Sequence, residues 1–109
     1  ASPWLDWFVG YSPEETVGKI KCPVMAINGE KDMQVPAQAN LDLLRNLLPD
    51  NGKNLIKGYP GKNHLFQNCS TGSVNEYESI EETISQDVLE DIVGWINSLE
   101  FIGKKKGTL

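Results

Sequence analysis

The stretch IKCPVMAINGEKDMQVP, residues 20–36, decides how the chain folds. Its first half is a short apolar run over residues 23–27, which ends at the turn residues Asn28 and Gly29. An apolar run of this length between turn residues predicts a buried parallel strand. The polar turn that follows delivers Asp32 just beyond the carboxyl end of the strand. In open α/β sheets, ligands and catalytic groups collect at that edge.

The residues after this turn predict a strand–helix–strand unit. A helix opens at Val35-Pro36 and stops at the turn residues 49–52, and a second strand follows over about residues 54–59. Two strands joined by a crossover helix are expected to be parallel, with a right-handed connection. The apolar stripe of the helix consists of Leu41, Leu44, Leu47 and Leu48.

The N-terminal residues predict a helix that leads into the first strand. Ser12 and Glu15 are spaced as a capping box, and Pro13 suits the first helical position, so the helix is expected to run to about Lys19. Aromatic residues at positions 4, 7, 8 and 11 have helical spacing and form either a core-facing stripe or part of a lid over a substrate pocket. We therefore assign residues 1–20 to the end of a lid or of connecting helices.

A long loop and a last helix complete the predicted order. The loop is polar, has no predicted secondary structure of its own and continues to about Glu78; loops of this length are often functional. The last helix is capped by Ser85 and is expected to end near Gly103. Residues 21–102 are thus assigned to the α/β portion and residues 103–109 to a flexible tail. The broad apolar face of the last helix consists of Val88, Leu89, Ile92, Trp95, Ile96 and Leu99.

The composition argues against several classes of function. The net charge of −5 disfavours nucleic acid as the main partner, and the basic cluster at residues 104–106 is interpreted as a solvated tail. No segment resembles a signal peptide or approaches the roughly 20 apolar residues of a membrane span. Cys22 and Cys69 do not have metal-ligand spacing and are expected to be free thiols in a reducing compartment, which predicts a cytoplasmic protein.

No cofactor is predicted. A single histidine with scattered carboxylates does not make a metal site. A nucleotide cofactor is not implied either, because the sequence has no glycine-rich turn between a strand and a helix.

Asp32 and His64 are the two residues that can carry chemistry together. Each follows one of the two predicted parallel strands, and parallel strands bring such turns to the same edge of the sheet. The carboxylate of Asp32 can then accept from the imidazole Nδ1–H of His64 and leave the other ring nitrogen as a general base. Taken singly, each residue is more simply an ordinary turn residue.

Two motifs resemble those of the α/β-hydrolase superfamily. Residues 29–36, GEKDMQVP, resemble its G-x-x-D-x-x-V-P acid turn, and residues 61–64, GKNH, resemble its G-x-x-H histidine loop. With HLFQ at residues 64–67, the long loop and the ISQDVL segment at 84–89, the chain is similar over about residues 12–99 to the C-terminal end of bacterial serine hydrolases of the serine-aminopeptidase-like, acyl-ester-hydrolysing group.

This resemblance implies an α/β fold, namely the C-terminal βαβ unit and terminal helix of an α/β-hydrolase with a partial parallel sheet. It also implies a Ser-His-Asp enzyme that cleaves an ester, amide or thioester bond, with Asp32 as the triad acid and His64 as the triad base. The chain order, in which the acid precedes the histidine, agrees with the order found in this superfamily.

The departure from the superfamily pattern is the missing nucleophile. The sequence contains no G-x-S-x-G motif, and neither cysteine is placed as a nucleophile. The oxyanion hole and several strands of the usual sheet are missing as well. We therefore expect the C-terminal part of a larger hydrolase that is inactive by itself. The serines, none of which lies on a strand-to-helix turn between glycines, are Ser2, Ser12, Ser70, Ser73, Ser79, Ser85 and Ser98.

Two further expectations follow from this interpretation. The first strand lacks a neighbour on one side, so the chain is expected to associate with itself through that edge. Two alternatives to a hydrolase segment stay open: a non-catalytic, hydrolase-like binding or assembly module, and an unrelated small α/β domain. The unrelated domain would be favoured if the Asp32 carboxylate and the His64 imidazole lay well beyond hydrogen-bond distance.

Overall fold

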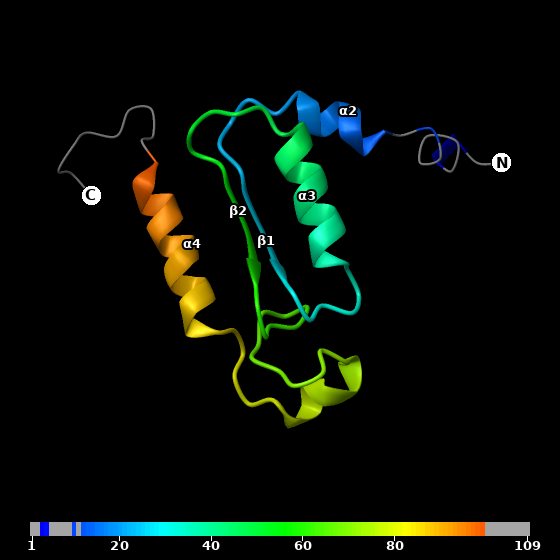
Figure 1. Cartoon of the computed structure of the whole chain (residues 1–109), viewed down its shortest axis with the longest axis vertical. Coiled ribbons are helices and arrows are strands. Elements are labelled where there is room, and N and C mark those ends of the chain that lie inside the picture. Colours follow the sequence, from blue (N-terminus) through cyan, green and yellow to red (C-terminus); the bar gives the residue numbers. More distant parts are fainter. Residues whose placement is uncertain (1–2, 5–9, 11, 100–109) are drawn as a thin grey trace.

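A computed structural model describes residues 3–4, 10 and 12–99 of the chain (Figure 1). Trp4 is described and is 65% exposed, whereas the other aromatic residues of the expected N-terminal stripe and the expected tail at 103–109 lie outside the described residues. The elements, in order, are α2 (Pro13–Gly18), β1 (Met25–Gly29), α3 (Ala37–Leu47), β2 (Leu55–Tyr59), the 3-10 helix η1 (Val74–Ser79) and α4 (Gln86–Ser98).

The two strands pair in parallel, as the sequence predicts. Their register runs from Met25 opposite Leu55 to Gly29 opposite Tyr59. The prediction that the first strand is buried is wrong for its first three residues, 25–27, which are half-buried, while Asn28 and Gly29 are buried. The reason is that β1 has β2 as its one neighbouring strand within the described part of the chain.

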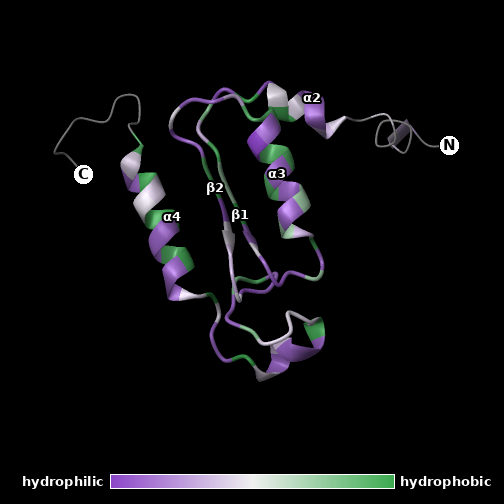
Figure 2. Cartoon of the chain, viewed as in Figure 1, coloured by the Kyte–Doolittle hydropathy of each residue, from purple (hydrophilic) through white to green (hydrophobic). Residues whose placement is uncertain are grey.

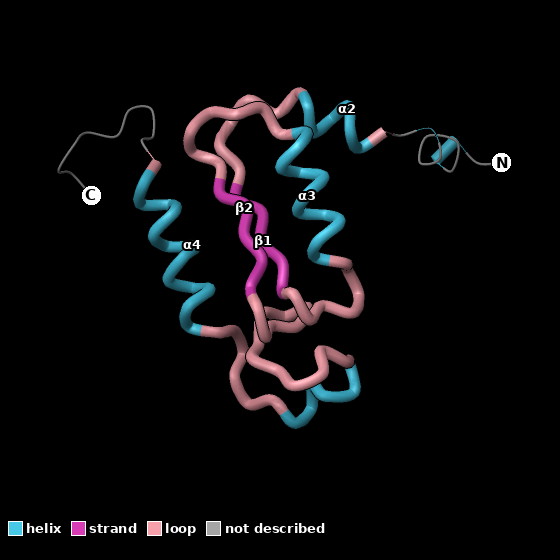
Figure 3. Tube along the Cα trace, in the orientation of Figure 1, coloured by secondary structure: helices cyan, strands magenta, loops and turns pink. Residues whose placement is uncertain are grey.

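Helix α3 is the main cover of this small sheet. It contacts both strands, and α2 packs in turn against α3 (Figure 3). Of the predicted leucine stripe, Leu41 and Leu48 are buried, whereas Leu44 and Leu47 are half-buried. The predicted N-terminal capping box is wrong: the Ser12 side chain accepts from no backbone N–H of the helix, and its hydroxyl donates to the carboxylate of Glu14 at 3.1 Å.

Helix α4 lies on the opposite side of the strands from α3 (Figure 1). Polar side chains join it to β2 and to the residues before β2. Its Asp91 carboxylate accepts from Lys57 Nζ at 2.7 Å and from the Tyr59 hydroxyl at 2.6 Å. The Trp95 indole donates to the carbonyl of Lys53 at 2.7 Å. Burial and the neighbouring Asp91 carboxylate raise the pKa of Tyr59, so its hydroxyl stays protonated and keeps this bond.

The apolar face of α4 is less buried than the sequence predicts. Val88 is fully buried, and Figure 2 colours several other positions along the helix as hydrophobic. Leu89, Val93 and Ile96 are 39%, 56% and 44% exposed. Within the described residues, the sheet beside α4 has only two strands, which is too little surface to cover these side chains.

Three expectations at the C-terminal half need correction. Helix α4 ends at Ser98 with Leu99 extended, whereas Gly103 lies outside the described residues. The Ser85 hydroxyl bonds to the carboxylate of Asp87 rather than capping a backbone N–H. The long loop expected to lack structure contains η1, which begins where the Ser73 hydroxyl accepts from the N–H of Asn75.

Candidate active site

Asp32 and His64 meet at the carboxyl end of the two parallel strands. Asp32 lies three residues past the end of β1, and His64 lies five residues past the end of β2. His64 Nδ1 is 2.8 Å from Asp32 Oδ2, which is hydrogen-bond distance. The structure therefore brings together the two residues that the sequence singles out. This distance also removes the observation that would have favoured an unrelated α/β domain.

The acid turn, residues 28–36, surrounds the Asp32 carboxylate with hydrogen-bond donors. Its Oδ1 accepts from the backbone N–H groups of Gln34 and Val35, both at 2.8 Å, and its Oδ2 also accepts from Asn28 Nδ2 at 3.2 Å. The Asp32 side chain is only 4% exposed. Burial by itself raises the pKa of Asp32, but the Val35 N–H, His64 and the Gln34 N–H outweigh it and leave the pKa below its ordinary 3.8.

The imidazole of His64 is held on one side and open on the other. Asp32 is ionised at neutral pH and can only accept a hydrogen bond, so the proton of this bond lies on His64 Nδ1. In the neutral imidazole the lone pair is then on Nε2. No described residue forms a hydrogen bond with Nε2, and the His64 side chain is 37% exposed. A ring in this state can accept a proton at Nε2 while Asp32 stabilises the imidazolium that results.

The acid turn packs closely on the histidine loop, residues 60–68. Lys31 N–H donates to the carbonyl of Lys62 at 2.9 Å. Gly29 lies against the backbone carbonyls of Lys62 and Asn63. A Cβ at Gly29 would be 2.3 Å from the carbonyl oxygen of Asn63, so only glycine permits this approach. This is a physical reason for the glycine in the G-x-x-D sequence.

A buried lysine fixes the far side of the histidine loop. The Lys62 side chain is 9% exposed, and its Nζ donates to Asn68 Oδ1 at 2.6 Å and lies 3.5 Å from the carboxylate of Asp87. Since Asp87 is in the first turn of α4, this ion pair ties the loop to the helix. The loop is also joined to the start of α4 by the Ser85 N–H, which donates to the carbonyl of Phe66 at 2.8 Å.

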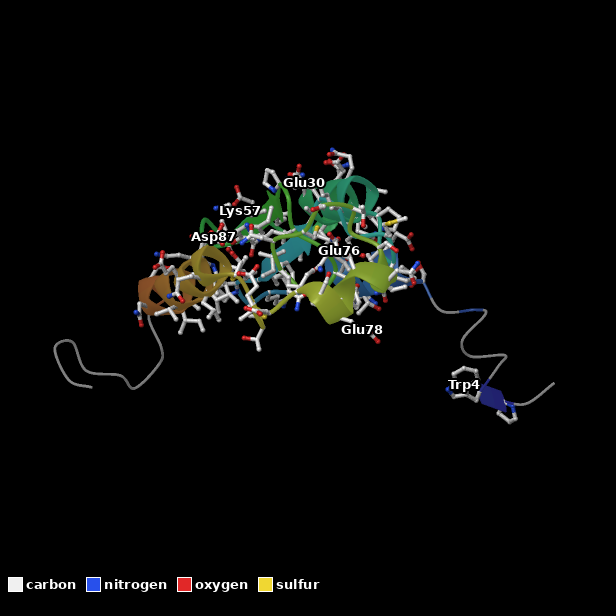
Figure 4. The ribbon with its side chains drawn as sticks, turned by 90° about the horizontal axis from the view of Figure 1, so that it is seen from below. Trp4, Glu30, Lys57, Glu76, Glu78 and Asp87 are labelled. Atoms are coloured by element: carbon white, nitrogen blue, oxygen red, sulfur yellow. The ribbon has the colours of Figure 1, made fainter. Side chains whose placement is uncertain are left out.

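Helix η1 lies against the acid turn through side chains of both. Gln34 Nε2 donates to the Tyr77 hydroxyl at 2.8 Å, and Lys31 Nζ donates to the carbonyl of Ser70 at 2.9 Å. Glu76 is directed into its own loop, while Glu78 points away from the molecule (Figure 4). These contacts place the loop over residues 70–79 beside the acid turn and make it part of the wall around the Asp32–His64 pair.

The Glu76 carboxylate organises the loop that precedes η1. It accepts from the N–H groups of Ser70, Thr71 and Gly72 at 2.8–3.1 Å and from the Thr71 hydroxyl at 3.1 Å. The Ser70 N–H is the largest cause, and together these donors lower the pKa of Glu76 from 4.5 to about 2. The carboxylate therefore acts as the anion of a small backbone nest.

An open hollow of about 390 Å³ lies beside this loop. Its walls include neither Asp32 nor His64, so it does not give access to the His64 imidazole. Apart from Ile80, the lining side chains are small or polar, which does not favour an apolar acyl group. The lining residues are Asn68, Cys69, Ser70, Glu76, Ser79 and Ile80.

The sequence reasoning missed the residues that hold the pair in place. Asn63, Lys62 and Gln67 are all buried, although polar residues in a loop are expected to face water. The signal that could have found Asn63 is the tendency of asparagine in a turn to bond backbone N–H groups two residues on. The buried Lys62 has no such local signal, because its partner Asp87 is distant in sequence.

The described residues contain no cluster of three or more potential metal ligands, and Cys22 and Cys69 are free thiols. None of the helices in the described part of the chain has the length and apolar character needed to cross a bilayer.

Comparison with known proteins gives one match. The sequence model of the dienelactone hydrolase family, which belongs to the α/β-hydrolase superfamily, matches residues 8–99. No curated protein and no solved structure matches the chain. The family match covers both the acid turn and the histidine loop, and it confirms the predicted superfamily and α/β fold class.

Proposed function

The chain belongs to the dienelactone hydrolase family, and we propose from this premise that it supplies the acid and the base of a Ser-His-Asp hydrolase. The observation that carries the proposal is the 2.8 Å contact between Asp32 Oδ2 and His64 Nδ1, with Nε2 left open. In this proposal Asp32 is the triad acid and His64 is the triad base.

The proposed reaction is acyl transfer to a serine and then to water. His64 Nε2 takes the proton of the serine hydroxyl as its oxygen attacks the carbonyl carbon of an ester, amide or thioester. The imidazolium then protonates the leaving group, and the acyl-serine is hydrolysed by a water that His64 activates in the same way. Asp32 stays ionised throughout, which its lowered pKa supports.

The nucleophile is proposed to lie on a segment outside these 109 residues. The support is that no serine of the sequence lies in a G-x-S-x-G motif and none contacts His64 Nε2 among the described residues. The donors of an oxyanion hole would come from the same segment, because one of them is the N–H after the nucleophile. The chain by itself is accordingly proposed to lack esterase activity.

We further propose a cytoplasmic location and association through the open edge of β1. The location is supported by the two free thiols, which are typical of reducing compartments. Association is supported by the half-buried apolar residues Met25, Ala26 and Ile27 on a strand with one described neighbour. A small-molecule acyl substrate is the proposed ligand, and nucleic acid and membranes are not proposed as partners.

The proposal is tested by replacing the base in the protein that carries this segment. His64→Ala should lower kcat for a p-nitrophenyl ester by about a hundred- to ten-thousandfold, the usual contribution of general acid–base catalysis. Asn46→Ala, an exposed change near the end of α3, is the matched control and should leave kcat unchanged. Unchanged turnover in the His64→Ala variant would reject the assignment and favour a non-catalytic module.

A further inference from the structure

Asn63 is one of the two largest fully buried side chains among the described residues, and it directly precedes His64. A carboxamide taken out of water is stable only if its polar atoms are bonded. Here Oδ1 accepts from the backbone N–H groups of Leu65 at 2.9 Å and Gln67 at 3.0 Å. Its Nδ2 donates to Gln67 Oε1 at 3.0 Å. The side chain thus satisfies two backbone N–H groups of the loop that have no backbone partner among the described residues.

These bonds link the residue before His64 to residues after it in the sequence. The backbone of Asn63 adds two more, since its N–H donates to the carbonyl of Gln67 and its carbonyl accepts from the N–H of Phe66, both at 3.1 Å. Phe66 has a φ of 59°, a left-handed conformation that a non-glycine residue keeps only where its surroundings impose it. The loop that carries the imidazole is therefore closed around the Asn63 carboxamide.

Asn63 also sets the distance from the histidine loop to the acid turn. Its carbonyl oxygen lies against the Cα of Gly29, at the end of the strand that presents Asp32. A movement of Asn63 therefore changes the spacing between Asp32 and His64 directly, and that spacing is now 2.8 Å.

We propose that Asn63 is a positioning residue: its buried carboxamide holds His64 on Asp32 and so selects the Nδ1-protonated tautomer of the imidazole. This inference rests on the proposed function, in which the tautomer leaves Nε2 free to act as the base. Asn63 does not touch the reacting atoms. It acts through the backbone of residues 64–67.

The test uses the fact that the chain has a single histidine, so the ¹⁵N signals of a labelled imidazole belong to His64. Spectra are recorded at about pH 8.5, where an imidazole is neutral. The wild type should show one tautomer, protonated at Nδ1. Asn63→Leu keeps the approximate size of the side chain and removes its polar atoms. In this variant the His64 Nδ1–H signal should be lost, and the imidazole ¹⁵N shifts should move most of the way to those of the chain unfolded in urea.

Asn54→Leu is the matched control. The Asn54 carboxamide also joins two backbone segments, accepting from the Val24 N–H and donating to the Pro49 carbonyl, both at 2.9 Å, but it lies at the opposite end of the strands from His64. This variant should lose a similar amount of stability and keep the wild-type tautomer. A folded Asn63→Leu variant with the wild-type tautomer, or an Asn54→Leu variant that loses it, would overturn the inference.

A second measurement on the wild type covers the case in which Asn63→Leu does not fold. The N–H groups of Leu65 and Gln67 should exchange with solvent about tenfold or more slowly than those of exposed loop residues such as Asn51, because each is bonded to Asn63 Oδ1. Exchange at the rate of the exposed loop would overturn the inference as well.

These results separate the inference from the proposed function. If His64→Ala leaves hydrolysis unchanged, the proposed function fails, whatever tautomer the spectra show. If His64→Ala abolishes hydrolysis while Asn63→Leu keeps the wild-type tautomer, only the positioning role of Asn63 fails.

Discussion

Asp32 is the single residue on which the geometry of the site depends most. It is nearly buried, it is ionised, and it satisfies two backbone N–H groups of its own turn as well as His64 and Asn28. Hydrogen bonds to a charged group contribute more than neutral ones. We therefore expect the ionisation of Asp32 to stabilise the fold as well as to orient the imidazole.

Asp32→Asn should lower the free energy of unfolding near pH 7 by about 1–3 kcal/mol, the usual contribution of hydrogen bonds to a charged group. The pKa of Asp32 is lowered on folding from its ordinary 3.8. Its contribution is therefore complete above that value and is lost as the pH falls through the lowered pKa of the folded state. Urea unfolding between pH 7 and pH 2.5 measures this difference.

Asp50→Asn is the control for this comparison, because Asp50 is exposed and accepts one N–H of its own loop, from Gly52 at 3.0 Å. It removes the same formal charge from a site away from His64 and should cost much less stability. A difference between wild type and Asp32→Asn that stays constant down to pH 2.5 would contradict the account.

At the scale of elements, the histidine loop and the loop before η1 are both held by polar side chains. In the histidine loop the side chains of Asn63 and Lys62 bond other residues of the loop, and in the following loop the Glu76 carboxylate does so. Asn63 and Glu76 bond backbone N–H groups, and Lys62 is a buried cation that bonds Asn68 and pairs with Asp87. The loops can therefore hold a fixed geometry without an apolar core of their own.

Glu76→Gln should loosen the loop before η1. The N–H groups of Ser70, Thr71 and Gly72 lose an ionised acceptor, so their exchange with solvent should become faster. The Glu76 pKa is lowered from 4.5 to about 2, so in the wild type the protection should be complete above pH 4.5 and disappear as the pH falls through about 2. Amide exchange measured by NMR tests both statements.

Glu78→Gln, in the same short helix, is the control. This side chain is exposed and directed away from the loop (Figure 4), so the same change of charge should leave the three N–H groups unaffected. Equal exchange rates in Glu76→Gln and in the wild type would show that the carboxylate does not organise the loop.

The sequence was sufficient for the two strands, for the existence of α2, α3 and α4, and for the meeting of Asp32 with His64. These follow from local patterns and from the rule that parallel strands end at one edge. The sequence was not sufficient for what holds the pair in place. The buried Lys62 is paired with Asp87, which is 25 positions further along. Such a contact joins segments that only the folded chain brings together.

At the scale of the whole molecule, β1 has an open edge, since β2 is its one neighbouring strand among the described residues. Leu55 N–H donates to the Val24 carbonyl and Glu30 N–H donates to the Tyr59 carbonyl, so alternate residues bond β2 and the N–H of Met25 and Ile27 face the other side. A free parallel edge with apolar residues is a template for another strand. The exposed apolar side chains of α4 add to the surface that a larger assembly could cover.

The 109-residue chain should therefore self-associate in a concentration-dependent manner in sedimentation velocity. Met25→Pro should weaken the association, because it removes an N–H from the open edge without removing a bond to β2. Met25→Ala changes the side chain but keeps the N–H, so it separates the loss of the donor from the loss of apolar surface. A wild-type chain that stays monomeric over the whole concentration range would contradict this prediction.

The central claim is that Asp32 and His64 activate a serine that lies outside these residues, and fluorophosphonate labelling tests it most directly. The reagent is applied to the isolated 109-residue chain and to the longer protein that carries it, and the adducts are located by mass spectrometry. The account predicts no adduct on the folded 109-residue chain, and an adduct on a serine of the remaining segment that is lost in His64→Ala. A stoichiometric adduct on Ser70 or Ser73 of the short chain, or labelling that is independent of His64, would contradict it.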